Sequence, residues 1–299
     1  MVGDEVVGEA PTEPAPGVRP SGDGLEFSVL GSGSSGNCVL VRGGGATVLV
    51  DAGLSLKETR ARMASLDLDA DDLDAVFITH EHADHVAHAG VLGRNLDATV
   101  FLGDGTRDAS ARLFKGEEDV APVFARTTIR VGGLKITAVK KPHDAAEPVA
   151  FLICGGDATL GIFTDLGHVD DMVADAISQC TLLVYEANHD PNLLARGPYP
   201  HSLKRRVGGA LGHMSNEDAA RGLARCLPSH LRSLVLAHLS SKNNHPTFVR
   251  DAFVRHLGED CDFPRWISYQ RRATPLFDGS GAIVRKPAVA EPAGEAVSA

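Results

Sequence analysis

The chain has 299 residues, 43% of them hydrophobic and 23% charged, an ordinary composition for a globular enzyme with a sizeable core. No stretch approaches the roughly 18 uninterrupted apolar residues of a membrane span, and the acidic, Pro- and Gly-rich start is unlike a secretory signal peptide, so we expect a cytoplasmic protein with no membrane partner. The formal net charge of −10 argues against non-specific attraction of polyanions, because that attraction comes from Lys and Arg.

Both ends of the chain differ in composition from its centre. Residues 1–24 and 286–299 are rich in Pro, Gly, Ala and Glu and show no apolar period. We therefore expect a disordered tail on either side of one folded domain that spans 25–285. The cysteines are odd in number and never form a C-x-x-C pair, which argues against a disulfide framework and a cysteine-based zinc module.

Strand and helix patterns follow one another between these tails. Short β-branched runs predict strands at 25–30, 38–41, 47–50, 75–79, 99–102, 134–139, 149–154, 159–163, 182–185 and 234–237. Gly155-Gly156-Asp157 predicts a hairpin between two of them. Helices are predicted over 171–177, from Ser215, and from Pro246 to Gly258. This mixture predicts an α/β (α+β) fold of two packed sheets with helices outside.

A dense set of metal-binding side chains follows the predicted strand 75–79. The run is His80-Glu81-His82-Ala83-Asp84-His85, and helical spacing continues through Val86, Ala89 and Leu92. Three imidazoles and a carboxylate thus lie on a tight turn between a strand and a helix. Imidazole and carboxylate are ligands that zinc and similar metals prefer. His80 and His82 can point the same way, while Asp84 and His85 can face an adjacent site.

Further ligand-type residues also follow predicted strands, namely His143, Asp165 and His238. Alone, each would more often be a loop or capping residue. With the four from the motif they supply seven ligands, enough for two divalent metal ions. A shared carboxylate, best assigned to Asp165, would hold the ions roughly 3.5–4 Å apart. Zinc and manganese are favoured, and iron is compatible with the same ligands.

This ligand set, with Val50-Asp51-Ala52-Gly53 upstream, resembles the metallo-β-lactamase superfamily over residues 25–269. The resemblance implies an αβ/βα four-layer sandwich of two mixed sheets, so that 25–285 is a metallo-β-lactamase-fold domain. It also implies that Asp51 lies beneath the metal site and supports it. A turn residue at a strand end would occupy the same place.

Other motifs narrow the resemblance to one branch. Tyr185-Glu186-Ala187-Asn188 and Gly212-His213-Met214-Ser215-Asn216 are similar to elements of the tRNase Z-like phosphodiesterases, where a glutamate–histidine pair helps to deliver a proton to the leaving oxygen. With Ser35-Gly36-Asn37, His143-Asp144-Ala145 and Asn243-Asn244, the chain resembles the YycJ/WalJ-like branch, described as nucleases with 5′ exonuclease activity on DNA. It shows neither an inserted β-CASP domain nor a flexible arm of the tRNase Z kind.

The branch implies a dinuclear phosphodiesterase in which a metal-bridging hydroxide attacks phosphorus. Asp84 would bind one metal and also orient or deprotonate the nucleophile. His213, kept protonated by Glu186, would protonate the leaving alkoxide. The pair is also open to plainer readings, Glu186 as a surface carboxylate and His213 as a neighbour of a helix cap.

Several polar residues are candidates for contact with the substrate. The Gly- and Ser-rich loop 31–38 could present N–H groups to a phosphate, or simply form a tight hairpin. The helix start at 215 could meet a phosphate with the positive end of its dipole, and the Asn pair at 243 could bind substrate or only make a turn. The candidates are Ser34, Ser35, Asn37, Ser215, Asn216 and Asn243.

The predicted partner is a nucleic acid, with DNA favoured over RNA, and an oligomer is compatible with the sequence. The acidic balance favours a short or end-directed substrate. Two other functions stay open. A thioester or lactone hydrolase of the same fold would use the same seven ligands but would give Glu186 and His213 no obvious task. A metal-bearing binding or regulatory protein without catalysis would show stoichiometric metal and no turnover.

Overall fold

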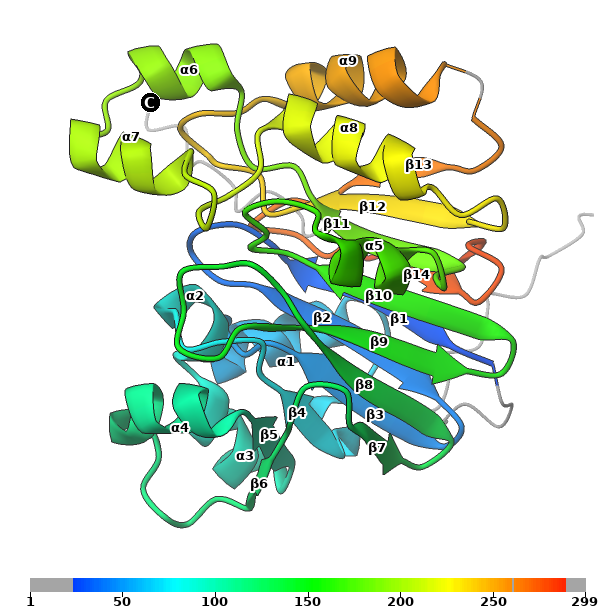
Figure 1. Cartoon of the computed structure of the whole chain (residues 1–299). Coiled ribbons are helices and arrows are strands. Elements are labelled where there is room, and N and C mark those ends of the chain that lie inside the picture. Colours follow the sequence, from blue (N-terminus) through cyan, green and yellow to red (C-terminus); the bar gives the residue numbers. More distant parts are fainter. Residues whose placement is uncertain (1–23, 260, 289–299) are drawn as a thin grey trace, which may run out of the picture.

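The computed structural model describes residues 24–259 and 261–288, whose strands form two sheets (Figure 1). In spatial order the first sheet contains β15 (Ile283–Arg285), β14 (Leu276–Asp278), β1 (Glu26–Gly31), β2 (Cys38–Gly43), β3 (Ala46–Val50), β4 (Ala75–Phe77), β5 (Thr99–Leu102) and β6 (Val120–Pro122). The second contains β13 (Arg265–Ile267), β12 (Ser233–Ala237), β11 (Leu182–Glu186), β10 (Ala158–Phe163), β9 (Val149–Gly155), β8 (Leu134–Lys140) and β7 (Thr128–Val131). Both sheets are mixed, because β3 to β6 and β10 to β13 pair in parallel and the other neighbours antiparallel.

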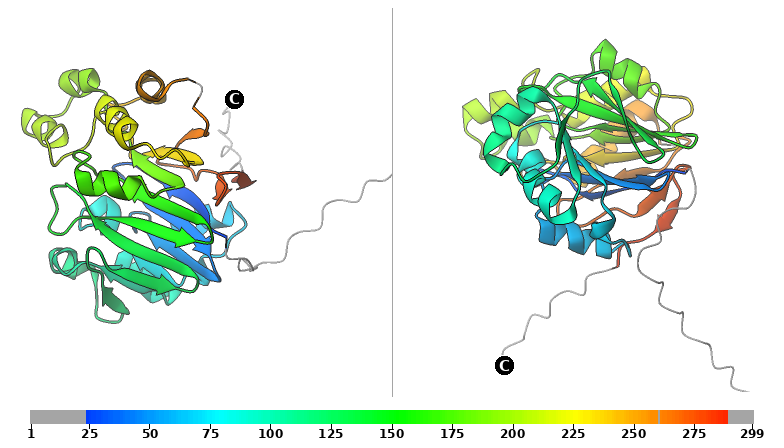
Figure 2. Two further views of the ribbon diagram at one scale, coloured as in Figure 1. Left: turned by 45° about the vertical axis from the view of Figure 1, so that its right-hand side comes forward. Right: turned by 90° about the horizontal axis from the view of Figure 1, so that it is seen from below.

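The described helices are α1 (Leu56–Ala64), α2 (Ala83–Val86), α3 (Ala89–Leu96), α4 (Asp104–Ser110), α5 (Asp171–Ile177), α6 (Pro191–Arg196), α7 (His201–Val207), α8 (Asn216–Cys226) and α9 (Pro246–Leu257). Residues of α1, α2 and α3 share one apolar cluster with the first sheet, and residues of α5, α8 and α9 share another with the second. The views in Figure 2 show the sheets face to face between these helix layers. This is the four-layer αβ/βα sandwich implied by the sequence motifs.

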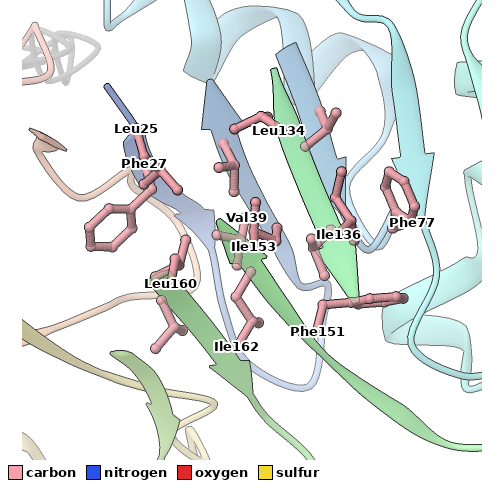
Figure 3. Close-up of a cluster of buried hydrophobic side chains, with 14 of the residues drawn as sticks. Leu25, Phe27, Val39, Phe77, Leu134, Ile136, Phe151, Ile153, Leu160 and Ile162 are labelled. Atoms are coloured by element: carbon pink, nitrogen blue, oxygen red, sulfur yellow. The ribbon is translucent and has the colours of Figure 1, made fainter. Parts of the chain in front are cut away.

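A third apolar cluster fills the space between the two sheets (Figure 3). Successive side chains of a strand point to opposite faces, so β9 serves two clusters. Phe151 and Ile153 enter the inter-sheet cluster, whereas Ala150 and Leu152 pack toward the helices. Phe151 meets Phe77 of the other sheet edge to face, with ring centroids 5.6 Å apart. Burial on both faces explains why these strands are continuous apolar runs in the sequence.

The ten predicted strands are all confirmed, with ends that differ by no more than two residues. The hairpin is confirmed by the pairing of Gly155 with Ala158. Helix α5 has the predicted bounds, Ser215 caps α8, and α9 runs from Pro246 to a cap at Gly258.

The continuous helical spacing predicted after the motif is wrong. α2 ends at Val86, and α3 starts only at Ala89. The chain bends between them because the His88 N–H donates to the carbonyl of Ala52 (2.9 Å) in the loop after β3, not to a residue of α2.

Most of the two predicted tails lies outside the described residues. Of their described part, Gly24 is exposed, and the Ala288 N–H donates to the Ser65 carbonyl at the end of α1 (2.7 Å). None of the helices in the described ranges is both long and apolar enough to cross a membrane.

Candidate metal centre

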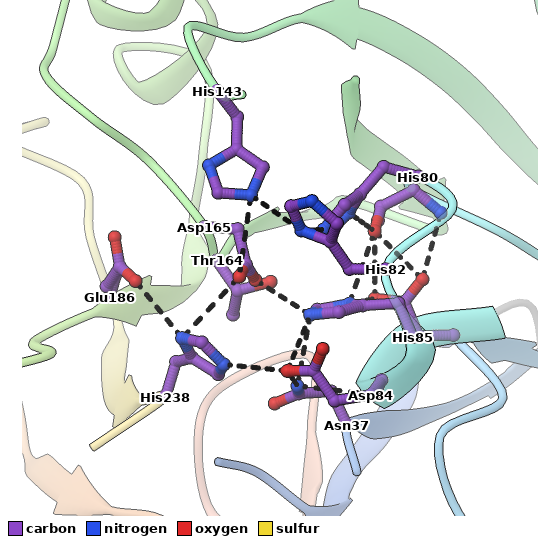
Figure 4. A network of polar contacts seen from close by, with 12 residues as sticks. Asn37, His80, His82, Asp84, His85, His143, Thr164, Asp165, Glu186 and His238 are labelled. Atoms are coloured by element: carbon purple, nitrogen blue, oxygen red, sulfur yellow. Dashed lines mark hydrogen bonds and ion pairs between the residues drawn. The ribbon is translucent and has the colours of Figure 1, made fainter. Parts of the chain in front are cut away.

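The sequence-predicted ligands meet where several strands end at one edge of the sandwich (Figure 4). They follow β4, β8, β10 and β12, while Asp51 follows β3 and Glu186 ends β11. Loops at the carboxyl ends of parallel strands commonly form binding sites. The seven side chains divide into a group of three imidazoles and a group of four mixed ligands, with Asp165 between them.

His80, His82 and His143 form the first group. Nδ1 of His82 lies 3.0 Å from Nε2 of His80 and 3.2 Å from Nε2 of His143. Nitrogens held about 2.0–2.1 Å from one tetrahedral zinc ion would be roughly 3.3 Å apart, so the spacing fits a shared cation. Burial lowers the pKa of all three rings, that of His143 to about 4, which keeps their lone pairs free.

Contacts behind the rings fix which nitrogen faces the centre. Nδ1 of His143 lies 3.1 Å from the carbonyl of Gly212, an acceptor, so this nitrogen carries the proton. Thr79 donates its hydroxyl to Asp51, and the same oxygen can accept from Nδ1 of His80 (2.9 Å). Both arrangements leave Nε2 unprotonated toward the centre, as a metal ligand requires.

Asp84, His85, Asp165 and His238 form the second group. Nε2 of His85 lies 3.0 Å from Asp165 Oδ2, and Nε2 of His238 lies 3.3 Å from Asp84 Oδ2. Asp165 also approaches the first group, with Oδ1 at 3.9 Å from Nε2 of His143. The contact between Oδ2 and His85 is an ion pair without hydrogen-bond geometry, although a buried carboxylate normally has its lone pairs satisfied by hydrogen bonds. A buried carboxylate oxygen that faces an imidazole nitrogen in this way fits a divalent cation.

The charges of the second group point the same way. Burial opposes a charge on the two histidines, but the carboxylates outweigh it, holding the pKa of His85 well above its ordinary value and raising the pKa of His238 to about 10. Burial would raise the pKa of Asp165, yet His238 and His85 hold it well below its usual range. Protons therefore balance the carboxylates in the metal-free group, and a divalent cation would take over that role.

Asp51 contacts the ring nitrogen of His85 that faces away from Asp165. Its Oδ2 lies 2.6 Å from Nδ1 of His85, while its Oδ1 accepts from the N–H and hydroxyl of Thr79, each at 2.9 Å. Carboxylates that accept from the far nitrogen of a ligating histidine fix its tautomer and ring orientation.

Backbone strain is concentrated at this centre. In the described ranges, six residues other than glycine have positive φ, and three of them are Asp51 (66°), Asp165 (55°) and His238 (57°). Left-handed backbone costs energy for residues with a Cβ and is found where function requires it. Here it turns each side chain into the centre at the end of β3, β10 or β12.

The loop that carries Asp51 also packs closely on the motif. A Cβ at Gly53 would lie 1.9 Å from the carbonyl oxygen of Asp84, so only glycine fits there. The neighbouring Asn37 N–H donates to that carbonyl (2.7 Å), and its side-chain amide lies 3.3 Å from Asp84 Oδ2.

Glu186 and His213 stand next to the second group. Glu186 Oε1 lies 2.8 Å from Nδ1 of His213 and 3.2 Å from Nδ1 of His238. Its Oε2 accepts from the N–H of Leu166 (2.8 Å). Burial would raise the pKa of Glu186, but His213 and His238 lower it to about 2, so it is an anion. The glutamate side chain is fully buried, whereas that of His213 is 20% exposed and can meet a substrate.

The six predicted substrate contacts lie in different environments. Ser34 and Ser35 are exposed at the tip of the loop between β1 and β2. The other four have at most 5% of their surface exposed, so their contact with a substrate stays a prediction: Asn37, Ser215, Asn216 and Asn243. The first three have structural hydrogen bonds, to Gly33 and Asp84, to the N–H of Asp218, and to Asn244, respectively.

Two basic residues beside the centre were not predicted. Arg206 of α7 donates to Asp144 (2.5 Å), and its guanidinium lies 3.2 Å from Nε2 of His82, outside the first group. The basic run Lys204-Arg205-Arg206, unusual in an acidic chain, is the sequence feature that could have indicated Arg206. Lys141 is buried and donates to the carbonyl of Thr164 (2.6 Å), next to Asp165. No sequence pattern distinguishes it from an exposed lysine.

Known proteins with similar sequences and structures agree on the family. The family described as "Beta-lactamase superfamily domain" matches residues 46–239. The exodeoxyribonuclease YycJ of Bacillus anthracis is 37% identical over 238 residues, covering 79% of this chain and 90% of that protein. The exodeoxyribonuclease WalJ of Streptococcus pneumoniae serotype 2 (strain D39 / NCTC 7466) is 35% identical over 264 residues, covering 85% and 98%.

Among solved structures, the metallo-β-lactamase fold protein YhfI from Bacillus subtilis covers 86% of this chain and 100% of its own, with a TM-score of 0.66 and 19% identity. That likeness concerns the fold alone, because the identity is low, whereas the two sequence relatives are 35–37% identical over most of both chains. The chain therefore belongs to the metallo-β-lactamase superfamily of metal-dependent hydrolases, in the branch that contains YycJ and WalJ.

Proposed function

We propose that this protein is a two-metal phosphodiesterase that removes nucleotides from the 5′ end of DNA. The observation that carries the proposal is the contact between buried Glu186 and partly exposed His213 (2.8 Å) beside the metal ligands. A hydrolase needs a proton donor only when its leaving group is a poor one, and the alkoxide of a nucleotide is such a group. The names of the relatives, exodeoxyribonucleases, support DNA and end-directed cleavage. The 5′ direction rests on the resemblance to their branch.

The proposed metal ligands are His80, His82, Asp84, His85, His143, Asp165 and His238, with Asp165 shared between two ions. Divalent cations bound there would activate a water molecule and neutralise charge on the phosphate oxygens. Zinc or manganese suits these ligands.

The side chains around the ions have separate tasks in this proposal. Asp84 is 22% exposed, unlike the nearly buried Asp165, so its carboxylate can also orient the attacking water. Glu186 accepts from Nδ1–H of His213, which leaves Nε2 to carry a proton for the leaving oxygen. The proton transfer would contribute about 10²–10⁴-fold to the rate. Arg206, exposed next to His82, is placed to bind a phosphate of the substrate.

The test is digestion of single- and double-stranded DNA and RNA, labelled at either the 5′ or the 3′ end, with zinc or manganese added. Stepwise shortening of DNA from the 5′ end, absent in Asp84→Ala, is the expected result. Shortening from the 3′ end would refute cleavage from the 5′ end, and a preference for RNA would refute DNA as the substrate. A protein that holds two metals but cleaves no phosphodiester would refute the function.

A further inference from the structure

A concave surface adjoins the loop between β1 and β2. It is a groove of about 1470 Å³ bounded by α1, α9, β13 and the segment 269–275 before β14, and none of the proposed metal ligands lines it. Ser35 lines the groove, whereas Asn37, two residues further along, contacts Asp84 and His85. One loop therefore contacts both the groove and the proposed metal centre.

The groove is basic, although the protein is acidic. Its lining includes one carboxylate, Glu58, and six cationic side chains, Arg62, Arg250, Arg265, Arg271, Arg272 and Lys286. The whole chain has 39 acidic residues against 29 Lys and Arg, so the groove reverses the overall balance. A local excess of positive charge in a concavity attracts a polyanion that the remaining surface repels.

Four of the six cationic side chains are available to a ligand. Arg62 and Arg265 donate to backbone carbonyls and serve the fold. The others are exposed, namely Arg250 on α9, Arg271 and Arg272 before β14, and Lys286 after β15. They come from three separate segments that line the groove, as contacts to successive phosphates of one nucleic acid strand would require.

Two aromatic rings also line the groove. Trp266, which packs on Phe277 of the core, and Tyr269 are both partly exposed. The guanidinium of Arg272 lies over the ring of Tyr269, 4.0 Å from its centre. Bases stack on aromatic rings and on guanidinium planes, and this requires unpaired bases with free faces. Positive charge combined with stacking surfaces is typical of sites for single strands and not for duplexes.

Hydrogen bonds tie the floor of the groove to the metal centre. The side-chain amide of Gln270 accepts from the Ser35 N–H (2.9 Å) and donates to the carbonyl of Gly36 (2.8 Å). Ser32 of the same loop accepts from the N–H of His238 (2.8 Å). A nucleic acid strand that left the groove at Ser35 would therefore contact a loop that is hydrogen-bonded to a proposed metal ligand.

We propose that this groove binds the single-stranded part of a nucleic acid substrate that lies beyond the nucleotide being cleaved. The proposal rests on the proposed nuclease function and adds a strand-binding site outside the metal centre. Its role would be to raise affinity for long substrates without changing the chemistry at the metals.

Binding can be measured separately from cleavage, on the full chain with metal removed by EDTA. Fluorescence anisotropy would give the Kd of a labelled oligothymidylate of about twelve nucleotides. Two groove variants would be compared, Arg271→Glu/Arg272→Glu and, on α9, Arg250→Glu. The control is Arg112→Glu/Arg130→Glu, which reverses two exposed arginines outside the groove.

Both groove variants should raise the Kd about tenfold or more, whereas the control keeps the wild-type value. Replacing the same arginines with Ala should reduce the slope of log Kd against log salt by about 0.7 for each phosphate that the variant no longer neutralises. A Kd unchanged in both groove variants would overturn the proposal. A second result would also overturn it. In that case the wild-type protein binds a DNA duplex more tightly than the single strand, and the groove variants weaken binding of the duplex.

Cleavage assays with metal separate this proposal from the proposed function. The groove variants should raise the KM for the oligonucleotide and leave hydrolysis of a small chromogenic phosphodiester unchanged. A wild-type protein that binds the oligonucleotide in the groove but hydrolyses neither substrate would contradict the nuclease function and leave the strand-binding groove standing.

Discussion

Asp51→Asn tests whether a residue that touches no substrate controls the metal centre through one histidine. In the structure, Oδ1 of Asp51 accepts from the N–H and hydroxyl of Thr79, and Oδ2 lies 2.6 Å from Nδ1 of His85. The amide oxygen of Asn would keep the Thr79 bonds, so its NH₂ group would face His85. Because an NH₂ group only donates, Nδ1 would become the acceptor and the ring proton would move to Nε2.

Nε2 of His85 is the nitrogen that faces Asp165 (3.0 Å), so this shift removes the lone pair a metal needs. Removing an outer partner of this kind typically lowers metal affinity 10–100-fold, which corresponds to about 1.4–2.7 kcal/mol. The first group, His80, His82 and His143, has no direct hydrogen bond to Asp51 in the described ranges; His80 is linked to it through the Thr79 hydroxyl, whose bond to residue 51 Asn would keep. One of two binding events should therefore weaken while the other stays unchanged.

The assay is titration of the metal-free protein with zinc in competition with a chromophoric chelator, with circular dichroism to check the fold. The matched control is Asp170→Asn, in which the changed carboxylate accepts from the Val173 N–H (2.8 Å) at the start of α5. Asn caps a helix about as well as Asp, so this variant should bind zinc like the wild type. Wild-type affinity at both sites of Asp51→Asn would refute the tautomer argument, and equal weakening of both would refute the separation into two groups.

Three further outcomes are expected. His213→Ala should keep its metal content and reduce kcat on oligonucleotides by about 10²–10⁴-fold; loss of metal would contradict the proton-donor role. Ser215→Ala should lower the free energy of unfolding by about 1 kcal/mol, measured by urea denaturation, because Ser215 caps α8, and a raised KM at unchanged stability would reverse that assignment. Zinc affinity should rise with pH, because the pKa of His238 is about 10 and that of His85 is raised, so zinc must displace protons from both rings. Calorimetry in buffers of different ionisation enthalpy measures the protons released on binding, and no release would contradict this expectation.

The strands that build the sandwich could be read from the sequence because helices cover their outer faces. In β9, for example, all but one of the residues are buried, which gives an uninterrupted apolar run. The missed strands are short or lie at the edges, such as β15 with two exposed residues out of three. Helix α1 could have been found, because Ser55 and Glu58 form a capping box. Helices α6 and α7 are largely exposed and carry no apolar stripe.

The clustering of the proposed metal ligands could be predicted for a related reason. Each follows a strand whose end is easy to recognise, and the structure brings all seven together. The substrate contacts could not be predicted in the same way. The side chains of Ser and Asn and the N–H groups at a helix start can hydrogen-bond to a phosphate. The same side chains also hydrogen-bond to the backbone of helix caps and turns, so the sequence does not separate the two uses. Ser215 and Asn216 show the second use, since one caps α8 and the other is paired with Asn244.

Net charge illustrates a different limit of sequence reasoning. A charge of −10 describes the average of a surface, whereas binding depends on where the charges lie. The six cationic side chains of the groove come from positions between 62 and 286, and only Arg271 and Arg272 are adjacent in the sequence, so it is the folded chain that collects them in one concavity. The acidic remainder then has a consequence of its own. It would repel a duplex from most of the molecule and leave the groove and the adjoining metal centre as the favourable place for a polyanionic strand. Raising the salt concentration should therefore weaken oligonucleotide binding and leave hydrolysis of a small phosphodiester nearly unchanged.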